Sequence, residues 1–141
     1  EVTTLHDKNL DRLTGFSLDV TGWDEAQHRT FVALKDALAG CFLFPSLAEV
    51  LQVASLFDMM LDIELKPESP LTKMVPGYTD MIGKEVGRLV RLHGLEKNVV
   101  VTGFDPKKLA GVNGKNEPSP IQVAMGVHGS VGSNAINAVN A

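Results

Sequence analysis

Apolar and polar residues alternate over Met59–Lys66, and this alternation predicts a β-strand with one apolar and one ionic face. The apolar face holds Met59, Leu61, Ile63 and Leu65. The other face holds Met60, Asp62, Glu64 and Lys66. Charged residues inside an otherwise apolar strand suggest that the ionic face is buried for a functional reason. The alternative is a solvated face whose charges pair with one another.

The strand is followed by turn residues and then by a helical pattern, which is the order found in βαβ units. Pro67–Pro70 ends the strand, and a helix is predicted from about Gly77 to His93. Chemistry in such units sits at the carboxyl ends of the strands. Glu64 and Lys66 are two positions apart at this end, so we expect them side by side on one face. The carboxylate could hold a divalent cation, and the ammonium could meet an anionic substrate.

The remaining patterns predict an α/β fold. Strands are predicted over residues 2–5, 59–66, 98–102 and 121–125. Helices are predicted over residues 24–39, 46–57, 77–93 and 105–112. Their alternation predicts a parallel sheet with right-handed crossovers. Residues 129–141 consist mostly of Gly, Ser, Asn and Ala, and we expect them to form a flexible tail after a domain that ends near residue 128.

Several helices carry local signals. Ser46–Glu49 has the form of a capping box, and Asp105–Pro106 is typical of a helix N-terminus. The helix that begins near Ser46 carries an apolar stripe expected to face the core, formed by Leu47, Val50, Leu51, Ala54 and Phe57. Gly83 and Gly87 each weaken the 77–93 helix by roughly 1 kcal/mol relative to alanine, which indicates close packing against another element.

Length and composition narrow the class of protein. The 141 residues fit one domain with its own core. A net charge of −4 without a basic cluster excludes the electrostatic footprint of a nucleic-acid binder. Cys41 is the single cysteine, so the chain has no internal disulfide framework and no cysteine-based zinc site. No segment approaches the roughly 18 apolar residues of a membrane span, and residues 1–20 lack a signal-peptide core, which slightly favours the cytoplasm and leaves the compartment open.

A second group of candidate residues lies near the start of the chain. His6 follows the β-prone segment Val2–Leu5, and a histidine leaving a strand is a candidate acid or base. A lone histidine is nevertheless more often structural. Asp7 or Asp11 could orient either His6 or Arg12.

Four motifs together resemble the glycerophosphodiester phosphodiesterase family. They read HDxxLDRxT at 6–14, PSLxEVL at 45–51, IELK at 63–66 and VVVxxFDxxxL at 99–109. The family pattern is close to HDxxLxRTT, PTLxEVL, IEIK and VxxSFDxxxL, in the same order and at fitting distances. The resemblance covers roughly residues 2 to 126.

The resemblance implies a PLC-like phosphodiesterase TIM barrel, of which residues 1–128 would form about half, similar to strands three to six. It implies metal-dependent hydrolysis, with Ca²⁺ or Mg²⁺, of a glycerophosphodiester to an alcohol and glycerol 3-phosphate. His6 is similar to the family's second catalytic histidine, Glu64 to its third metal-binding carboxylate, and Lys66 to the lysine that meets the phosphate. Candidate supporting residues are Asp7, Arg12 and Asp62.

The chain also departs from the family pattern. The first catalytic histidine, in an HRG motif, and two acidic ligands, in an ExD motif, are expected upstream of residue 1, and Gly103 replaces a serine. We therefore expect this chain alone to be inactive and to self-associate through open sheet edges. Two alternatives remain: a truncated, non-catalytic relative that binds a phosphodiester or a partner protein, and another metal-dependent phosphodiesterase of phospholipase type on the same barrel.

Overall fold

The protein has an open sheet of parallel strands packed against helices. The computed structural model describes residues 2–5, 7, 9–15, 17, 26, 29–30, 33, 36–37, 45–66, 77–115, 119–126 and 137–138. Strands β1 (Leu61–Leu65), β2 (Val99–Gly103) and β3 (Gln122–Met125) pair in parallel and in sequence order. The predicted α/β alternation of parallel strands and helices is thus confirmed for this part of the chain.

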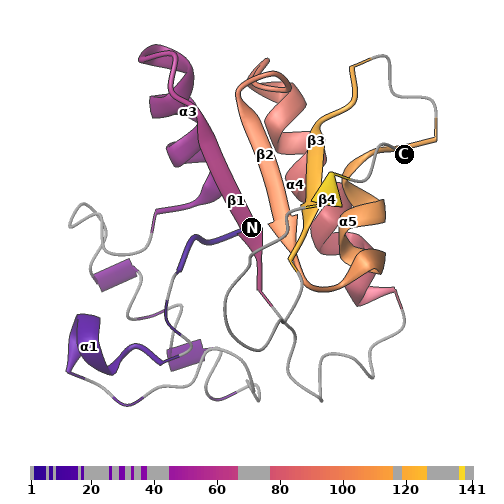
Figure 1. Cartoon of the computed structure of the whole chain (residues 1–141). Helices are drawn as coiled ribbons and strands as arrows, with labels where there is room; N and C mark the ends of the chain where they lie inside the picture. Colours follow the sequence, from indigo (N-terminus) through magenta and orange to yellow (C-terminus); the bar gives the residue numbers. More distant parts are fainter. Residues whose placement is uncertain are drawn as a thin grey trace, which may run out of the picture.

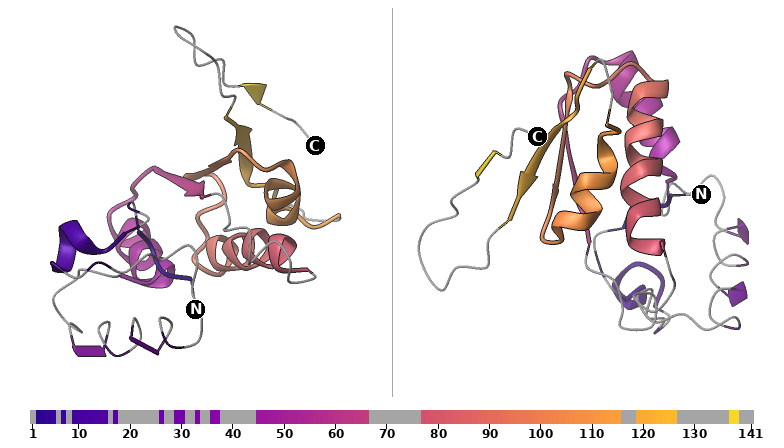
Figure 2. Two further views of the ribbon diagram at one scale, coloured as in Figure 1. Left: turned by 90° about the horizontal axis from the view of Figure 1, so that it is seen from below. Right: turned by 90° about the vertical axis from the view of Figure 1, so that its right-hand side faces the viewer.

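The helices that cover the sheet all lie on one of its faces. They are α3 (Leu47–Leu56), α4 (Tyr78–Leu92) and α5 (Pro106–Val112). The right-hand view of Figure 2 shows the strands edge-on with these helices on the same side. No described helix lies on the opposite face, which is turned toward the viewer in Figure 1. This one-sided cover decides which strand residues are buried and which are free to meet a ligand.

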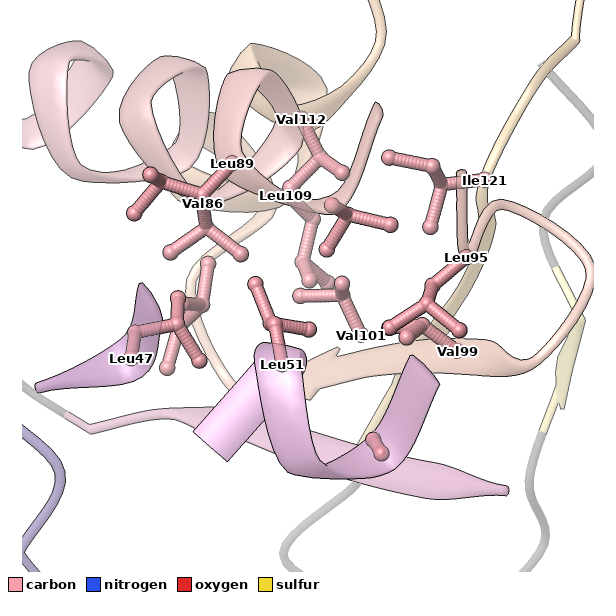
Figure 3. Close-up of a cluster of buried hydrophobic side chains, with 13 residues drawn as sticks. Leu47, Leu51, Val86, Leu89, Leu95, Val99, Val101, Leu109, Val112 and Ile121 are labelled. Carbon is pink, nitrogen blue, oxygen red and sulfur yellow. The ribbon is translucent and has the colours of Figure 1, made fainter. Parts of the chain in front are cut away.

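The hydrophobic core fills the space between the sheet and the helices (Figure 3). Its members come from every covering helix and from the strands, and include Leu47, Leu51, Val86, Leu89, Leu95, Val99, Val101, Leu109, Val112 and Ile121. Each is less than a tenth exposed. Full burial of one such side chain stabilises a fold by about 1.5–3 kcal/mol. The core therefore contributes strongly to holding the helices against the sheet.

Helices α4 and α5 pack unusually closely, as the two glycines of α4 predict. A Cβ atom on Gly83 would collide with the main-chain carbonyl oxygen of Lys108, and one on Gly87 would collide with that of Val112. Only hydrogen atoms fit at these two points. The helix cost of the glycines is therefore offset by the contact that they permit.

Both predicted helix N-termini are confirmed. The Ser46 hydroxyl accepts a hydrogen bond from the Glu49 amide at 3.2 Å, and the Glu49 carboxylate accepts one from the Ser46 amide at 2.7 Å. At α5, the Asp105 carboxylate accepts from the Lys107 amide at 2.9 Å. One part of the predicted core stripe is wrong, because Phe57 lies beyond the end of α3 and is 74% exposed.

The prediction that Val2–Leu5 is a strand of the sheet is wrong. This segment instead forms an isolated antiparallel bridge, between Thr3 and Ser46, at the start of α3. The Val2 carbonyl accepts a hydrogen bond of 2.8 Å from the amide of Leu47. A first-turn amide has no acceptor inside its own helix, so this short segment satisfies the helix end and not a sheet edge.

Other predictions fall partly on residues outside the described ranges. Within the predicted 24–39 helix, the described residues 26, 29–30, 33, 36 and 37 are helical. The apolar residues at helical spacing in this segment, Phe31, Leu34 and Leu38, lie outside the described residues. Of the predicted tail over 129–141, the structure describes Asn137–Ala138, which form β4 antiparallel to β3. β1 begins at Leu61, two residues later than Met59, where the alternation starts. Among the helices in the described part of the chain, none is long and apolar enough to cross a membrane.

Candidate functional site

Glu64 and Lys66 lie side by side on the face of β1 that points away from the helices. The Lys66 ammonium is 2.7 Å from a Glu64 carboxylate oxygen. The side chains are 40% exposed for Lys66 and 37% exposed for Glu64, so the expectation of a buried ionic face is wrong for the described chain. The physical reason is the one-sided helix cover, which buries Leu65 and leaves the alternate residues to solvent.

This ion pair is at the carboxyl end of the sheet, where ligands bind in open α/β folds. β1 and β2 end in register, with Leu65 opposite Gly103. Because parallel strands run in the same direction, the residues that follow them gather at the same end of the sheet. Lys66 and Phe104 are two of these residues. The carboxyl end of the sheet therefore combines a cation, an anion and an aromatic ring.

Phe104 was not singled out by sequence reasoning. Its ring lies against Gly126, where a Cβ atom would be 2.5 Å from the ring carbon Cε1. The Gly126 amide also donates a hydrogen bond of 2.9 Å to the Gly103 carbonyl oxygen, which links the ends of β2 and β3. Phe104 remains 40% exposed, so part of the residue is accessible to solvent at the carboxyl end of the sheet. A glycine directly after a predicted strand was the available signal for this close approach.

Asp62 is held by a neighbouring strand. The Thr102 hydroxyl donates a hydrogen bond of 2.8 Å to an Asp62 carboxylate oxygen. Thr102 is also the register partner of Glu64. Asp62 therefore joins β1 to β2 on the ionic face, and its role as a supporting site residue stays a prediction.

The candidates near the start of the chain form a separate pair. Arg12 donates a hydrogen bond of 2.6 Å to the Asp7 carboxylate through Nε. Arg12 lies in the short helix α1 (Asp11–Thr14), which sits to one side of the sheet, beyond β1, in Figure 1. Asp7 thus orients Arg12, one of the arrangements that the sequence left open. His6 lies outside the described residues.

Lys108 is a further residue that sequence reasoning missed. It is only 4% exposed, and its ammonium donates a hydrogen bond of 2.6 Å to the main-chain carbonyl oxygen of Lys66. Its neighbour Lys107 is exposed. The signal in the sequence was spacing, because Lys108 is four residues before the buried Val112 and therefore on the same helix face.

The pKa values of one ion pair on α4, away from the carboxyl end of the sheet, are clearly shifted. Arg88 donates two hydrogen bonds of 2.8 Å to the Glu85 carboxylate. These hydrogen bonds hold the pKa of Glu85 below its usual value and raise the pKa of Arg88. Both side chains are well exposed, so the pair adds little to stability.

A divalent cation would need more ligands than the described residues of this face supply. Ca²⁺ takes about six to eight oxygen ligands, and Mg²⁺ about six. Among the described residues, no group of three or more His, Cys, Asp or Glu side chains is placed to hold a metal ion. Glu64 is one candidate ligand, while Asp62 accepts the Thr102 hydrogen bond. On this face Glu64 could therefore serve as one ligand of a divalent cation, with its other ligands outside the described residues.

Comparisons with protein-family models, with curated proteins and with solved structures found no match to this chain. The function is therefore inferred from its own motifs and geometry. The motif residues Glu64 and Lys66 are those that the fold brings together at the carboxyl edge.

Proposed function

We propose that this chain contributes to a phosphodiester hydrolase of the glycerophosphodiester phosphodiesterase type, built on a PLC-like TIM barrel. Such an enzyme hydrolyses a glycerophosphodiester to an alcohol and glycerol 3-phosphate. The observation that carries the proposal is the Glu64–Lys66 pair, at the carboxyl end of a parallel sheet and on the face that no described helix covers. TIM-barrel enzymes keep their helices outside and their active sites at this end.

The two charged groups suit the two parts of such a site. Lys66 offers an ammonium to the substrate phosphate, and Glu64 offers one hard oxygen ligand. Their mutual ion pair is exposed, so separating them costs at most about 1 kcal/mol. A phosphate could therefore take the place of the carboxylate beside Lys66 without a large rearrangement. Further ligands for a divalent cation would have to come from outside the described residues.

His6 would act as the proton donor to the leaving alkoxide. This role follows from the HDxxLDRxT motif, and His6 lies outside the described residues. The adjacent Asp7 pairs with Arg12, whose side chain is 68% exposed. General acid catalysis of this kind contributes about 10² to 10⁴ in rate.

The proposal is tested with the protein expressed from its complete reading frame. We expect release of glycerol 3-phosphate from glycerophosphocholine in the presence of Ca²⁺ or Mg²⁺. Glu64→Gln should weaken cation binding in calorimetric titrations, whereas His6→Ala should lower turnover about 10²-fold or more with the cation still bound. Lys97→Met, which removes an exposed cation elsewhere, is the matched control and should change neither.

Two outcomes would contradict this assignment. One is the absence of hydrolysis in the complete protein, and the other is full cation affinity after Glu64→Gln. A non-catalytic phosphodiester-binding relative is the second candidate, because the partly exposed Lys66 ammonium could bind a phosphate group without a metal ion. It predicts glycerol 3-phosphate binding that depends on Lys66 without turnover of any phosphodiester.

A further inference from the structure

The buried position of Lys108 is unusual for a lysine. Removing an ammonium from water is costly unless it is paired or hydrogen-bonded. The residue is nevertheless only 4% exposed, and its Nζ lies 2.6 Å from the Lys66 carbonyl oxygen. Methionine would fill nearly the same volume without this cost. The ammonium and its hydrogen bond to the Lys66 carbonyl oxygen therefore distinguish this position from an ordinary core position.

The carbonyl that Lys108 binds lies one residue beyond β1. The described parallel pairing ends where Leu65 is opposite Gly103. Lys66 follows that last pair, so the ladder between β1 and β2 no longer fixes its main chain. Lys108 supplies a side-chain hydrogen bond at this point and thereby ties the end of β1 to α5.

Lys108 can restrain the Lys66 main chain because its own main chain is restrained by packing. Its carbonyl oxygen lies against Gly83 of α4, where no Cβ atom would fit. The packing of α4 on α5 therefore restrains Lys108, and Lys108 restrains Lys66. Side chains alternate along an extended chain, so a fixed main chain at Lys66 keeps its ammonium on the face of Glu64.

We propose that Lys108 is a positioning residue for the anion site. Its hydrogen bond to the Lys66 carbonyl oxygen holds Lys66 on the Glu64 face and so raises the affinity of that site for a phosphate group. The inference rests on the proposed function in one respect, namely that Lys66 binds phosphate. Lys108 acts through the Lys66 main chain and makes no contact of its own with the anion.

The test compares Lys108→Met with Lys107→Met, a matched change at the exposed neighbour. Inorganic phosphate and glycerol 3-phosphate are titrated into the 141-residue chain, and the Lys66 amide signal is followed by ¹⁵N NMR. Loss of one hydrogen bond should raise the dissociation constant about fivefold in Lys108→Met and leave it unchanged in Lys107→Met. The ¹⁵N heteronuclear NOE of the Lys66 amide should fall in Lys108→Met alone.

A second background separates positioning from direct contact. Lys66→Ala removes the ammonium but keeps the main-chain carbonyl that Lys108 binds, so the hydrogen bond from Lys108 should remain. In that background Lys108→Met should no longer change phosphate affinity, although it should still lower the NOE of the residue 66 amide. This non-additivity is the signature of a residue that acts through another. An equal loss of affinity in both backgrounds would show that Lys108 meets the anion itself and would overturn the proposal.

The remaining outcomes also decide the matter. If the parent chain binds neither phosphate nor glycerol 3-phosphate, the proposed function loses its anion site, and the positioning role is judged on the NOE alone. An unchanged Lys66 NOE in Lys108→Met overturns it. If Lys108→Met does not fold, Lys108→Arg is used instead. The proposal then requires that the NOE of the Lys66 amide and the affinity for phosphate change together. A change in affinity with unchanged order contradicts the inference.

Discussion

At the scale of single residues, the Glu64–Lys66 pair is a site feature more than a stabilising one. Both side chains are more than a third exposed, and exposed ion pairs contribute about 0–1 kcal/mol. The strand that carries them is held instead by Leu65 and by the Asp62–Thr102 hydrogen bond. Substitutions at Glu64 and Lys66 can therefore be used to test function without loss of the fold.

Replacement of either member of the pair should leave stability nearly unchanged. Lys66→Met and Glu64→Gln should each shift the free energy of unfolding by less than about 1 kcal/mol, because solvent already screens the pair. Urea denaturation followed by circular dichroism measures the shift, with Lys97→Met as the control. A loss of several kcal/mol would indicate that the pair is structural.

At the scale of elements, local signals predicted most of the helices and strands. The Ser46–Glu49 cap and the glycines of α4 act through neighbours a few residues away or through one close contact, so the sequence reveals them. The pairing of Val2–Leu5 depends on a distant partner and was mispredicted. A spacing of two placed Glu64 beside Lys66, but their exposure depends on where the helices lie. Spacing places Lys108 on the same helix face as Val112, but only the packing of α5 in the fold shows that this face is covered.

Alanine at Gly83 or Gly87 should destabilise the protein, although alanine favours helix. The added methyl group would meet main-chain atoms of α5, which cannot move aside as a flexible side chain can. Overpacking of this kind costs about 1–3 kcal/mol, more than the roughly 1 kcal/mol gained in helix propensity. Thermal unfolding of both variants measures the cost, with Lys84→Ala on the exposed face of α4 as the control. A raised melting temperature in Gly83→Ala would contradict the close α4–α5 contact.

Removal of the α3 cap should have a smaller effect. Ser46→Ala deletes the hydroxyl that accepts from the Glu49 amide, and loss of such a cap costs about 1 kcal/mol. The bond from the Ser46 amide to the Glu49 carboxylate remains, so the helix should still start at Leu47. Urea denaturation should show the loss, and Ser55→Ala, near the other end of α3, should not. Equal stability of Ser46→Ala and the parent would mean that the capping box is not needed.

At the scale of the whole molecule, the sheet has one covered face and one without a described helix. β1 is the first strand in the sheet order and pairs with β2 on one side, so its other edge is open among the described residues. Large apolar side chains are also exposed around the start of β1, namely Val53, Leu56, Phe57, Met59 and Met60. Open edges and clustered apolar side chains both favour association between chains.

We therefore expect the 141-residue chain to form dimers or larger assemblies, or to bind a hydrophobic dye, at micromolar concentration. Sedimentation velocity measures the first and dye fluorescence the second. Phe57→Ser combined with Met60→Ser should reduce both, because these side chains are 74% and 69% exposed beside β1. Met81→Ser, at a similarly exposed residue at the other end of the fold in α4, is the control and should leave both unchanged. A monodisperse parent monomer with a cooperative thermal transition and no dye binding would show that the open face and edge are closed within one chain.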